Sequence, residues 1–253
     1  MSSYFIYDSI NMYRSDNTSS EGTSDGSTFT PGTAITDHER ANDENIGTVI
    51  SAVANNAGIQ YAVGSTATAD AAAVYFTGDD GVSSGTIMTF FIDTDRASLP
   101  SKGTISAVSG AGWAVADLTE TTGDKFFTEF NASVSNVSEI LIGKKLTFEV
   151  EPDVNVQSTI NYENEVQKSL GGVEYALNVN PGQEIITISF QNISSTFKAN
   201  LITMQDHLLG ESKKFLYNDG TNFHWVRLDA SLVFTEIADS RFSTQIKLRQ
   251  QIQ

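Results

Sequence analysis

The residues of this 253-residue chain that could do chemistry are three histidines, a Gly-x-Ser-x-Gly stretch and several acids in close spacing. His38, His207 and His224 are far apart in the sequence, and no H-E-x-x-H motif joins any two of them. A zinc site built from these three residues is therefore not expected. The chain has no cysteine, which excludes disulfides and thiolate metal sites.

The stretch "GVSSG", residues 81–85, matches the nucleophile elbow of serine hydrolases in its letters alone. That motif needs a buried strand before it and a helix after it, so that the serine is held on a strained turn. Here Asp-Asp-Gly precedes Ser83, and the β-like run "TIMTFFI" follows it. We interpret the stretch as a hairpin turn.

Acids and tryptophans offer weaker signals of the same kind. Asp79-Asp80 and the pair Asp93 and Asp95 could bind calcium, but neither matches an EF-hand loop, and we interpret them as solvated turn residues. Paired carboxylates for glycoside hydrolysis meet only in space, so a sequence rich in acids does not reveal them. Trp113 and Trp225 could stack on sugars, yet each lies in a strand-like run, which favours buried anchors. The sequence therefore predicts no catalytic, cofactor-binding or metal-binding residue and no enzymatic activity.

The net charge of -16, from 31 acids and 15 bases, disfavours binding to nucleic acid or to an anionic membrane. The simplest interpretation of this charge is solubility. The first residues, "MSSYFIYDSI", lack a basic region followed by a long apolar stretch, so we expect no secretory signal. No apolar run reaches the ~18 residues of a membrane helix.

The elements that would position any site are mostly strands. Short runs rich in Val, Ile, Thr and aromatic residues are separated by turn residues, which is typical of an antiparallel sandwich. These runs are 46–54, 59–65, 71–78, 86–95, 112–119, 125–134 and 138–143. Residues 46–57 could instead form a helix because they include several alanines. Residues 14–36 are rich in Ser, Thr, Gly and Asp and are predicted to be a loop or arm, either flexible or ordered by a neighbouring chain.

The second half alternates apolar and polar residues, as half-buried strands do. Between the strands, Phe197, Leu201, Met204 and Leu208 are spaced for one face of a helix at about 195–209. Ser194 or Ser195 can cap its start, and Gly210 suits its end.

These patterns predict a mainly β fold with two tandem antiparallel β-sandwich domains, the second with a single flanking helix. We place an N-terminal segment and arm at 1–44, the first sandwich at 45–143 and the second at 144–253. Gly143 would allow the chain to change direction, and Lys144-Lys145 would be a solvated joint. A hairpin across this junction, within one domain, remains an alternative.

The order of elements in the second half resembles that of tail-tip proteins of tailed bacteriophages, of the distal-tail and baseplate-hub type. The segments that carry the resemblance are "EILIGK", "LTFEVEP", "ITISFQNIS", the helix "TFKANLITMQDHLLG" and the closing "HWVRLDASLVFTEIADSRFSTQIKLRQQ". The first half resembles the galactose-binding-like sandwich that such proteins sometimes carry first. This resemblance rests on Phe126, Phe127, Phe130, Val137, Glu139, Ile140, Ile142 and Gly143. A departure from that pattern is that no Trp or Arg is found where a sugar-binding rim would need one.

The resemblance implies a structural protein of the virion that forms a homo-oligomeric ring around the tail axis and is assembled in the host cytoplasm. Its partners would be other copies of itself, the tail tube and other tail-tip or baseplate proteins, with no sequence-specific nucleic acid binding and no membrane insertion. No cofactor is expected. The alternative is a carbohydrate-binding module or adhesin that recognises host glycans through the first sandwich. A hydrolase with carboxylates assembled in space is the third possibility.

Overall fold

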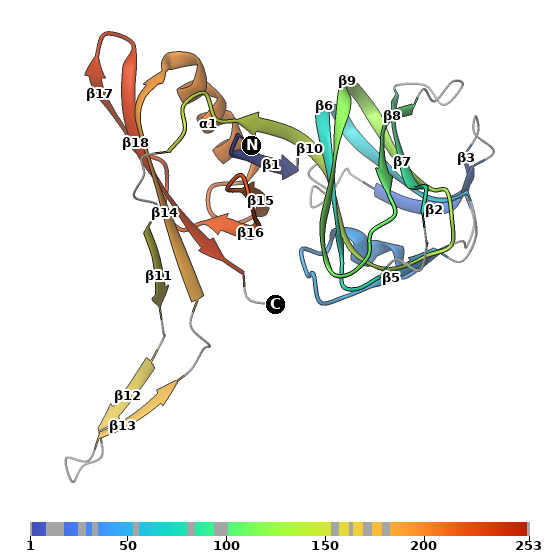
Figure 1. Cartoon of the computed structure of the whole chain (residues 1–253), viewed down its shortest axis with the longest axis horizontal. Coiled ribbons are helices and arrows are strands. Elements are labelled where there is room, and N and C mark those ends of the chain that lie inside the picture. The colour runs from blue at the N-terminus through green and yellow to red at the C-terminus, as the bar shows by residue number, and fades with distance from the viewer. Residues whose placement is uncertain are drawn as a thin grey trace. The chain divides into compact units, whose positions relative to one another are not determined.

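The computed structural model describes residues 2–8, 18–24, 29–31, 35–52, 56–79, 84–93, 101–152, 157–161, 164–168, 174–178 and 183–251. The fold is mainly antiparallel β, with a single α-helix among the described residues, as predicted (Figure 1). The chain forms two compact units, an N-terminal unit of Ile6–Leu146 and a C-terminal unit of Met1–Phe5 with Thr147–Gln253. None of the described helical segments has the length and apolar character that a membrane span requires.

The N-terminal unit contains ten strands among its described residues, the first and last of which run on into the C-terminal unit. Their bounds are β1 Tyr4–Asp8, β2 Thr18–Ser24, β3 Phe29–Pro31, β4 Ile35–Thr36, β5 Ile50–Ala52, β6 Ala57–Phe76, β7 Thr86–Asp93, β8 Ser101–Ser106, β9 Gly112–Phe130 and β10 Val134–Thr147. A short 3-10 helix, η1, spans His38–Asn42. The alternative of a helix at 46–57 is wrong at Ile50–Ala52, which form the strand β5. Residues 53–55 lie outside the described part.

Strands β6 and β9 pair along almost their whole lengths, and each replaces two of the predicted short strands. The first part of β6 also pairs with β2, whereas its last part pairs with β10. The register of β6 against β9 shifts between Ala62 and Ala67 and again between Ala69 and Ala71. Such irregularities bend a ribbon without ending its ladder, which is why polar residues in the middle of each strand did not break it.

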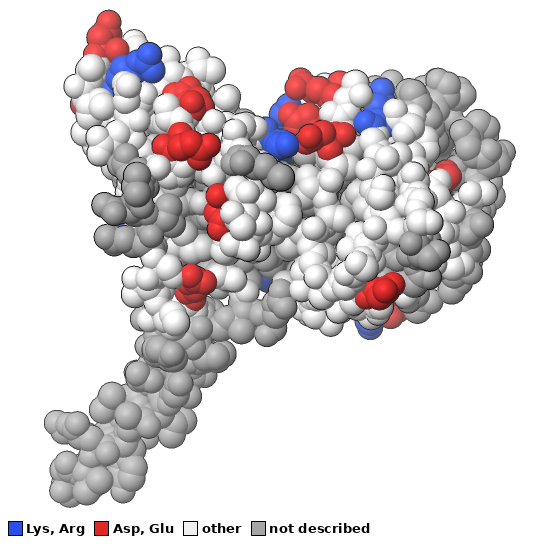
Figure 2. Space-filling model, in the orientation of Figure 1, with Lys and Arg blue, Asp and Glu red and all other residues white. Residues whose placement is uncertain are grey.

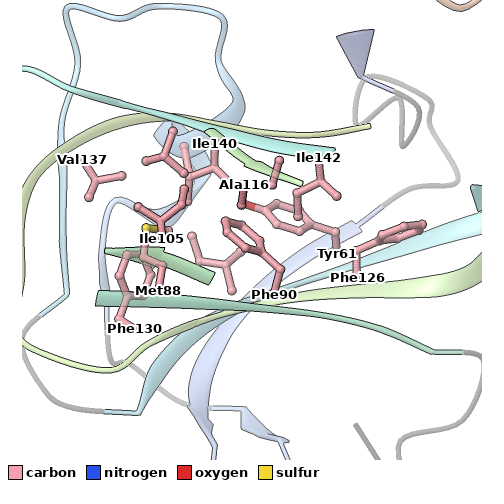
Figure 3. Packing of buried hydrophobic residues seen from close by; sticks show 14 of the residues in the cluster. Tyr61, Met88, Phe90, Ile105, Ala116, Phe126, Phe130, Val137, Ile140 and Ile142 are labelled. Carbon is pink, nitrogen blue, oxygen red and sulfur yellow. The ribbon is translucent and has the colours of Figure 1, made fainter. Parts of the chain in front are cut away.

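The register shifts also change which residues of β6 face the core. Ile59 and Tyr61 are buried before the shifts, and Val74 and Phe76 after them, so the inward positions pass from odd to even numbers. The two parts of the sheet thus bury a shared core of aliphatic and aromatic side chains. Figure 3 shows Tyr61, Phe90 and Phe126 packed with Ala116, Ile140 and Ile142.

The prediction of a loop or arm at 14–36 is wrong for the described residues Thr18–Ser24 and Phe29–Pro31, which form strands. β2 pairs with β6 from Thr18↔Ala62 to Thr23↔Ala57, and β3 pairs in turn with β2. Backbone N–H and C=O groups form these ladders whatever the side chains, so a Ser- and Thr-rich segment can extend a sheet that already exists. Residues 14–17, 25–28 and 32–34 lie outside the described part.

The junction near Gly143 is neither a hairpin nor a change of direction, because β10 runs through it as one strand. Gly143 is required for a different reason: a Cβ at this position would lie 1.8 Å from the carbonyl oxygen of Tyr7. The division between the units falls after Leu146, within β10, whereas we had placed it at Gly143.

The two lysines after Gly143 are ion-paired rather than solvated. The Nζ of Lys144 lies 2.8 Å from Asp70 and 3.1 Å from Glu120, and the Nζ of Lys145 lies 2.7 Å from Asp117. Burial alone would lower the pKa of Lys144, but the two carboxylates outweigh it and raise that pKa above its ordinary 10.5. These contacts hold the end of β10 to β6 and β9.

In the C-terminal unit, strands β11, β14, β18, β16 and β15 are neighbours in that order, and β17 also pairs with β18. The bounds are β11 Gln157–Asn161, β14 Gln183–Ser194, β15 Lys214–Asn218, β16 Phe223–Leu228, β17 Phe234–Ala238 and β18 Arg241–Gln250. Two further strands, β12 Asn164–Lys168 and β13 Glu174–Asn178, form a separate two-stranded sheet.

The predicted helix is confirmed as α1, Ser195–His207, capped by the hydroxyl of Ser194, which accepts a bond of 3.1 Å from the N–H of Phe197. Ser194 also donates 2.6 Å to the carboxylate of Glu149, which places a negative charge at the positive end of the helix dipole. The helix is followed by Gly210 at φ 72, as predicted. Its stripe of Phe197, Leu201, Met204 and Leu208 is buried.

An aromatic cluster forms the core under this helix. The ring of Phe148 lies 4.7 Å from that of Phe5 and 4.9 Å from that of Phe190, both in edge-on contact. Phe197 and Tyr217 complete the cluster around Phe148 at 6.3 Å and 6.2 Å. Edge-on aromatic pairs stabilise a core beyond the area that they bury.

Candidate interaction surface

The histidines do not form a metal centre with any described residue. His224 pairs with Asp219 at 3.1 Å in the turn between β15 and β16, and His38 lies 3.4 Å from Glu39 in η1. His207 is the last residue of α1. In the described part of the chain, no three His, Asp or Glu side chains are grouped as metal ligands.

Asp219 organises its turn through hydrogen bonds. Its Oδ1 accepts from the backbone N–H of Asn222 at 2.6 Å and of Thr221 at 2.7 Å. Burial alone would raise the pKa of Asp219, but these bonds and the ring of His224 lower it below its ordinary 3.8. In the adjoining strand, burial raises the pKa of Tyr217 to about 12, with a smaller contribution from the charge of Asp219.

Most of the loop residues considered from the sequence, Ser83 and the acids of the two turns, are not described. Ser83, Asp80 and Asp95 lie outside the described residues, as does the side chain of Asp93. Asp79 is exposed, and its carbonyl oxygen accepts a 2.7 Å bond from Asn136.

The two tryptophans differ in burial. Trp225 is buried, which confirms its predicted role as an anchor. Trp113 is only half-buried at the start of β9, with its ring 5.2 Å from that of Tyr75, so the prediction of a buried anchor is wrong for Trp113. Trp113 is the second residue of β9 and follows Gly112, the cross-strand partner of Phe76.

The described surface of the C-terminal unit contains a groove of ≈ 690 Å³ on the sheet face formed by β14, β18 and β17. Ser189, Gln245 and Lys247 line it and alternate along their strands with the buried Ile188, Ile246 and Leu248. Because successive side chains point to opposite faces, the groove lies on the face away from the aromatic core. The full lining is Ser189, Phe190, Gln191, Ala230, Ser231, Val233, Thr235, Ile237, Ser243, Thr244, Gln245 and Lys247.

The chemistry of this groove contrasts with that of the chain. Its lining residues include no Asp or Glu and one cation, Lys247, although the chain has a net charge of -16 and acids are spread over the visible face in Figure 2. Hydroxyl and amide groups form most of its floor. Two aliphatic side chains line the groove and are open to solvent, Val233 at 71% and Ile237 at 52% exposure.

The wall of the groove is fixed by short contacts. The hydroxyl of Thr244 donates a hydrogen bond of 2.8 Å to the carbonyl oxygen of Val233. Arg249 donates one of 2.6 Å to the carboxylate of Asp229, at the start of the loop that joins β16 to β17. On the opposite face, the Nζ of Lys198 on α1 lies 3.9 Å from the centre of the Phe242 ring, a cation–π contact. The β17–β18 hairpin is therefore held in place even though its outer edge is open. In the described part of the chain, β17 pairs with β18 alone.

The sequence did not indicate this groove, because part of its lining, residues 189–191, lies 39 residues before the rest, which begins at Ala230. The only signal was the alternation of Ser243, Gln245 and Lys247 with buried apolar residues, which we interpreted as a wet sheet face. That alternation identifies an exposed face, but it does not tell whether the face is hollow.

No family model and no curated protein matches the chain. Among solved structures, a CBM32 module of CpGH89 from Clostridium perfringens is similar at 10% identity and a TM-score of 0.37 over 52% of this chain and 95% of its own length. A truncated AlyQ with CBM32 and alginate lyase domains matches at 17% identity and a TM-score of 0.36 over 75% of this chain and 54% of its own. The CBM32 of AlyQ in complex with 4,5-unsaturated mannuronic acid matches at 17% identity and a TM-score of 0.31 over 47% of this chain and 95% of its own. None of these three is a tail protein.

Proposed function

We propose that the chain is a non-enzymatic structural subunit that assembles with copies of itself in a bacteriophage tail tip or baseplate. The observation that carries the assembly is the two-stranded sheet of β12 and β13, drawn in yellow in Figure 1. Each strand has five residues, and no third described strand pairs with either. A two-stranded ribbon of this size is at best marginally stable in water, so a neighbouring subunit would be needed to hold it.

The distribution of exposed apolar side chains supports the same proposal. Among the described residues, five large hydrophobic side chains are exposed in the C-terminal unit, and one, Val49, in the N-terminal unit. The five are Ile160, Ile202, Leu209, Val233 and Ile237. Two of them, Val233 and Ile237, lie together in the lining of the groove and are the part of this set that a partner could cover as one surface.

The bacteriophage setting of this proposal rests on the sequence resemblance alone. It includes a location in the virion, assembly in the host cytoplasm, a ring around the tail axis, and contacts with the tail tube and other tip proteins. The acidic chain is compatible with a channel that DNA must pass without adhering.

The ribbon can be tested by excision, because Asn161 and Gln183 are direct cross-strand partners. Replacing residues 162–182 by Asn-Gly would close β11 and β14 with a two-residue hairpin turn. We expect the shortened chain to keep its circular dichroism spectrum and to lose the oligomeric state of the wild type in light scattering. A wild type that stays monomeric at every concentration and never joins tail components would contradict the proposal.

A second candidate function is carbohydrate binding by the N-terminal unit, and it rests on the half-buried Trp113 beside Tyr75. Partly exposed aromatic rings are the groups on which sugar faces stack. One of the similar structures carries mannuronic acid on its CBM32, which is a statement about that protein. We expect a glycan array to detect binding by the wild type and not by Trp113→Ala, with Thr122→Ala as the control; no binding by the wild type would remove this candidate.

A further inference from the structure

β17 and the groove beside it carry two of the exposed apolar side chains, Val233 and Ile237. We propose that a second copy of this chain docks here, with the β17 strands of the two copies paired antiparallel across a two-fold axis. This inference rests on the proposed homo-oligomeric function. A two-fold contact joins copies in pairs, so the ring of that proposal would need a second, head-to-tail contact elsewhere on the chain.

The first argument is the state of the edge. In the described part of the chain, β17 uses one side to pair with β18, from Phe234↔Thr244 to Ala238↔Arg241, with a register shift between Glu236 and Ala238 that leaves Ile237 out of this ladder. Its other side leaves backbone donors and acceptors for another strand, and four of its five residues are exposed. Natural proteins cover or charge such edges to prevent uncontrolled pairing. On its groove face this edge carries Thr235 and Ile237 and no charge.

The second argument concerns charge. Two copies of a chain with a net charge of -16 repel each other, so a self-contact is least costly where acids are missing. The groove residues include no carboxylate, and Lys247 adds a positive charge. An antiparallel pair of identical strands keeps the same face of both sheets on one side. The two grooves would therefore join into one surface free of acids in its lining.

Charge and apolar contact also favour one register of the pair over another. Centring the pair on Glu236 would place two carboxylates directly opposite each other, which is destabilising. Centring it on Ile237 places that side chain opposite Ile237 of the second copy and Glu236 opposite Ala238. The exposed Ile237 would then be covered by an apolar neighbour on the groove face.

Strand β11, which is also an edge strand in the described part of the chain, serves as a matched comparison. Ile160 on β11 is exposed at 58%, similar to the 52% of Ile237. Ile160 is the direct cross-strand partner of Glu184. Glu184 lies two residues before the buried Ile186 and so on the same face of β14, which places Ile160 on the face opposite to the groove. Pairing β17 with β11 of another copy in one continuous sheet would not bring the two isoleucines together unless the sheet were inverted.

The chain has no native cysteine, so a single introduced thiol reports this contact directly. Residues opposite each other in an antiparallel pair have Cα atoms about 4.5–5.5 Å apart, which suits a disulfide. We expect Ile237→Cys in the full chain to form a covalent dimer on mild oxidation, whereas Ile160→Cys stays uncrosslinked. We also expect Ile237→Glu, but not Ile160→Glu, to weaken self-association at least tenfold in sedimentation velocity.

The outcomes separate the two proposals. If the wild type associates but Ile237→Cys does not crosslink and Ile237→Glu associates normally, the β17 contact is wrong and the structural function stands. Crosslinking of Ile160→Cys instead would assign the contact to β11 and overturn the inference. A wild type that is monomeric at all concentrations would remove both. Circular dichroism of each variant shows whether it folds. If Ile237→Cys fails to fold, a mixture of Thr235→Cys and Asp239→Cys replaces it, because the proposed pairing places residue 235 of one copy opposite residue 239 of the other. We expect that mixture to form a covalent dimer on mild oxidation.

Discussion

In the N-terminal unit, the long ribbon of β6 and β9 bends and buries one core between its two parts. In the C-terminal unit, one helix covers one face of a sheet, and the other face remains hollow and open. The first unit has one exposed large hydrophobic side chain among its described residues, whereas the second has five. The first unit buries nearly all of its described large apolar side chains internally, whereas the second leaves five of them exposed, and the proposed contacts would cover part of these.

Both units have mixed cores. The N-terminal core combines many aliphatic and aromatic side chains from strands far apart in the sequence. The C-terminal core also buries many aliphatic side chains, and its rings gather around Phe148. Removing one ring should therefore affect the C-terminal unit strongly, and four substitutions can sharpen or break this comparison.

The largest effect is expected for Phe148→Ala. Phe148 is buried and contacts four other rings, so its loss should lower the free energy of unfolding of the C-terminal unit by about 3–5 kcal/mol. Urea unfolding followed by the fluorescence of Trp225 in a Trp113→Phe background would report this unit alone. Phe148→Leu should cost clearly less, and a loss under about 1 kcal/mol for Phe148→Ala would show that the ring cluster is not the core of the unit.

The next effect is expected for Gly143→Ala in the N-terminal unit. The added Cβ would meet the carbonyl oxygen of Tyr7, a backbone atom that cannot move without shifting β1, and we expect a loss of about 3 kcal/mol. Gly78→Ala is the matched control, because its Cβ would meet only the side chain of Asn136 at 3.3 Å. Equal stability of these two variants in thermal unfolding would contradict the close approach of β1 to β10.

A smaller effect is expected for Ser194→Ala at the start of α1. The substitution removes the hydroxyl that accepts from Phe197 and leaves Glu149 with one partner fewer, at a cost of about 1 kcal/mol. Ser195→Ala removes a hydroxyl one position later that does not cap the helix. If both variants lose the same stability in urea unfolding, the cap is not the cause.

The smallest effect concerns the pH dependence of the β15–β16 turn. Because the pKa of Asp219 in the folded state lies below its ordinary 3.8, its charge stabilises the fold above that value. This contribution is lost as the pH falls through the folded pKa. We expect urea unfolding at pH 3 and pH 6 to differ less for Asp219→Asn than for the wild type. Asp206→Asn, an exposed acid on α1, should keep the full wild-type difference.

The sequence predicted the helix well and the strands of the N-terminal unit less well. The spacing of Phe197, Leu201, Met204 and Leu208 and the capping Ser194 are local signals, and they placed α1 to within two residues at its end. The predicted breaks inside 57–76 and 112–130 were wrong, because polar residues at a bulge resemble polar residues at a turn. Only the cross-strand partner distinguishes the two cases.

Local sequence signals likewise revealed only part of the candidate surface. Ser243, Gln245 and Lys247 were recognisable as a wet face from their alternation, but the loop at 230–233 and the strand β14 that complete the groove were not connected to them by any pattern. The prediction that Lys144 and Lys145 are solvated was wrong. Their partners Asp70 and Asp117 lie some thirty to seventy residues earlier in the chain, so no local pattern connects them.

The sequence by itself determined the period of each element, the cap of the helix, the lack of thiol chemistry and the acidic charge, because these depend on residues within one or two turns of chain or on composition. The tertiary structure alone decided that β6 and β9 are continuous strands, that Gly143 admits the backbone of Tyr7, and that β17 ends a sheet beside a groove free of acids. These features depend on which strand lies beside which, and a strand's neighbour is set by long-range packing that local sequence does not encode.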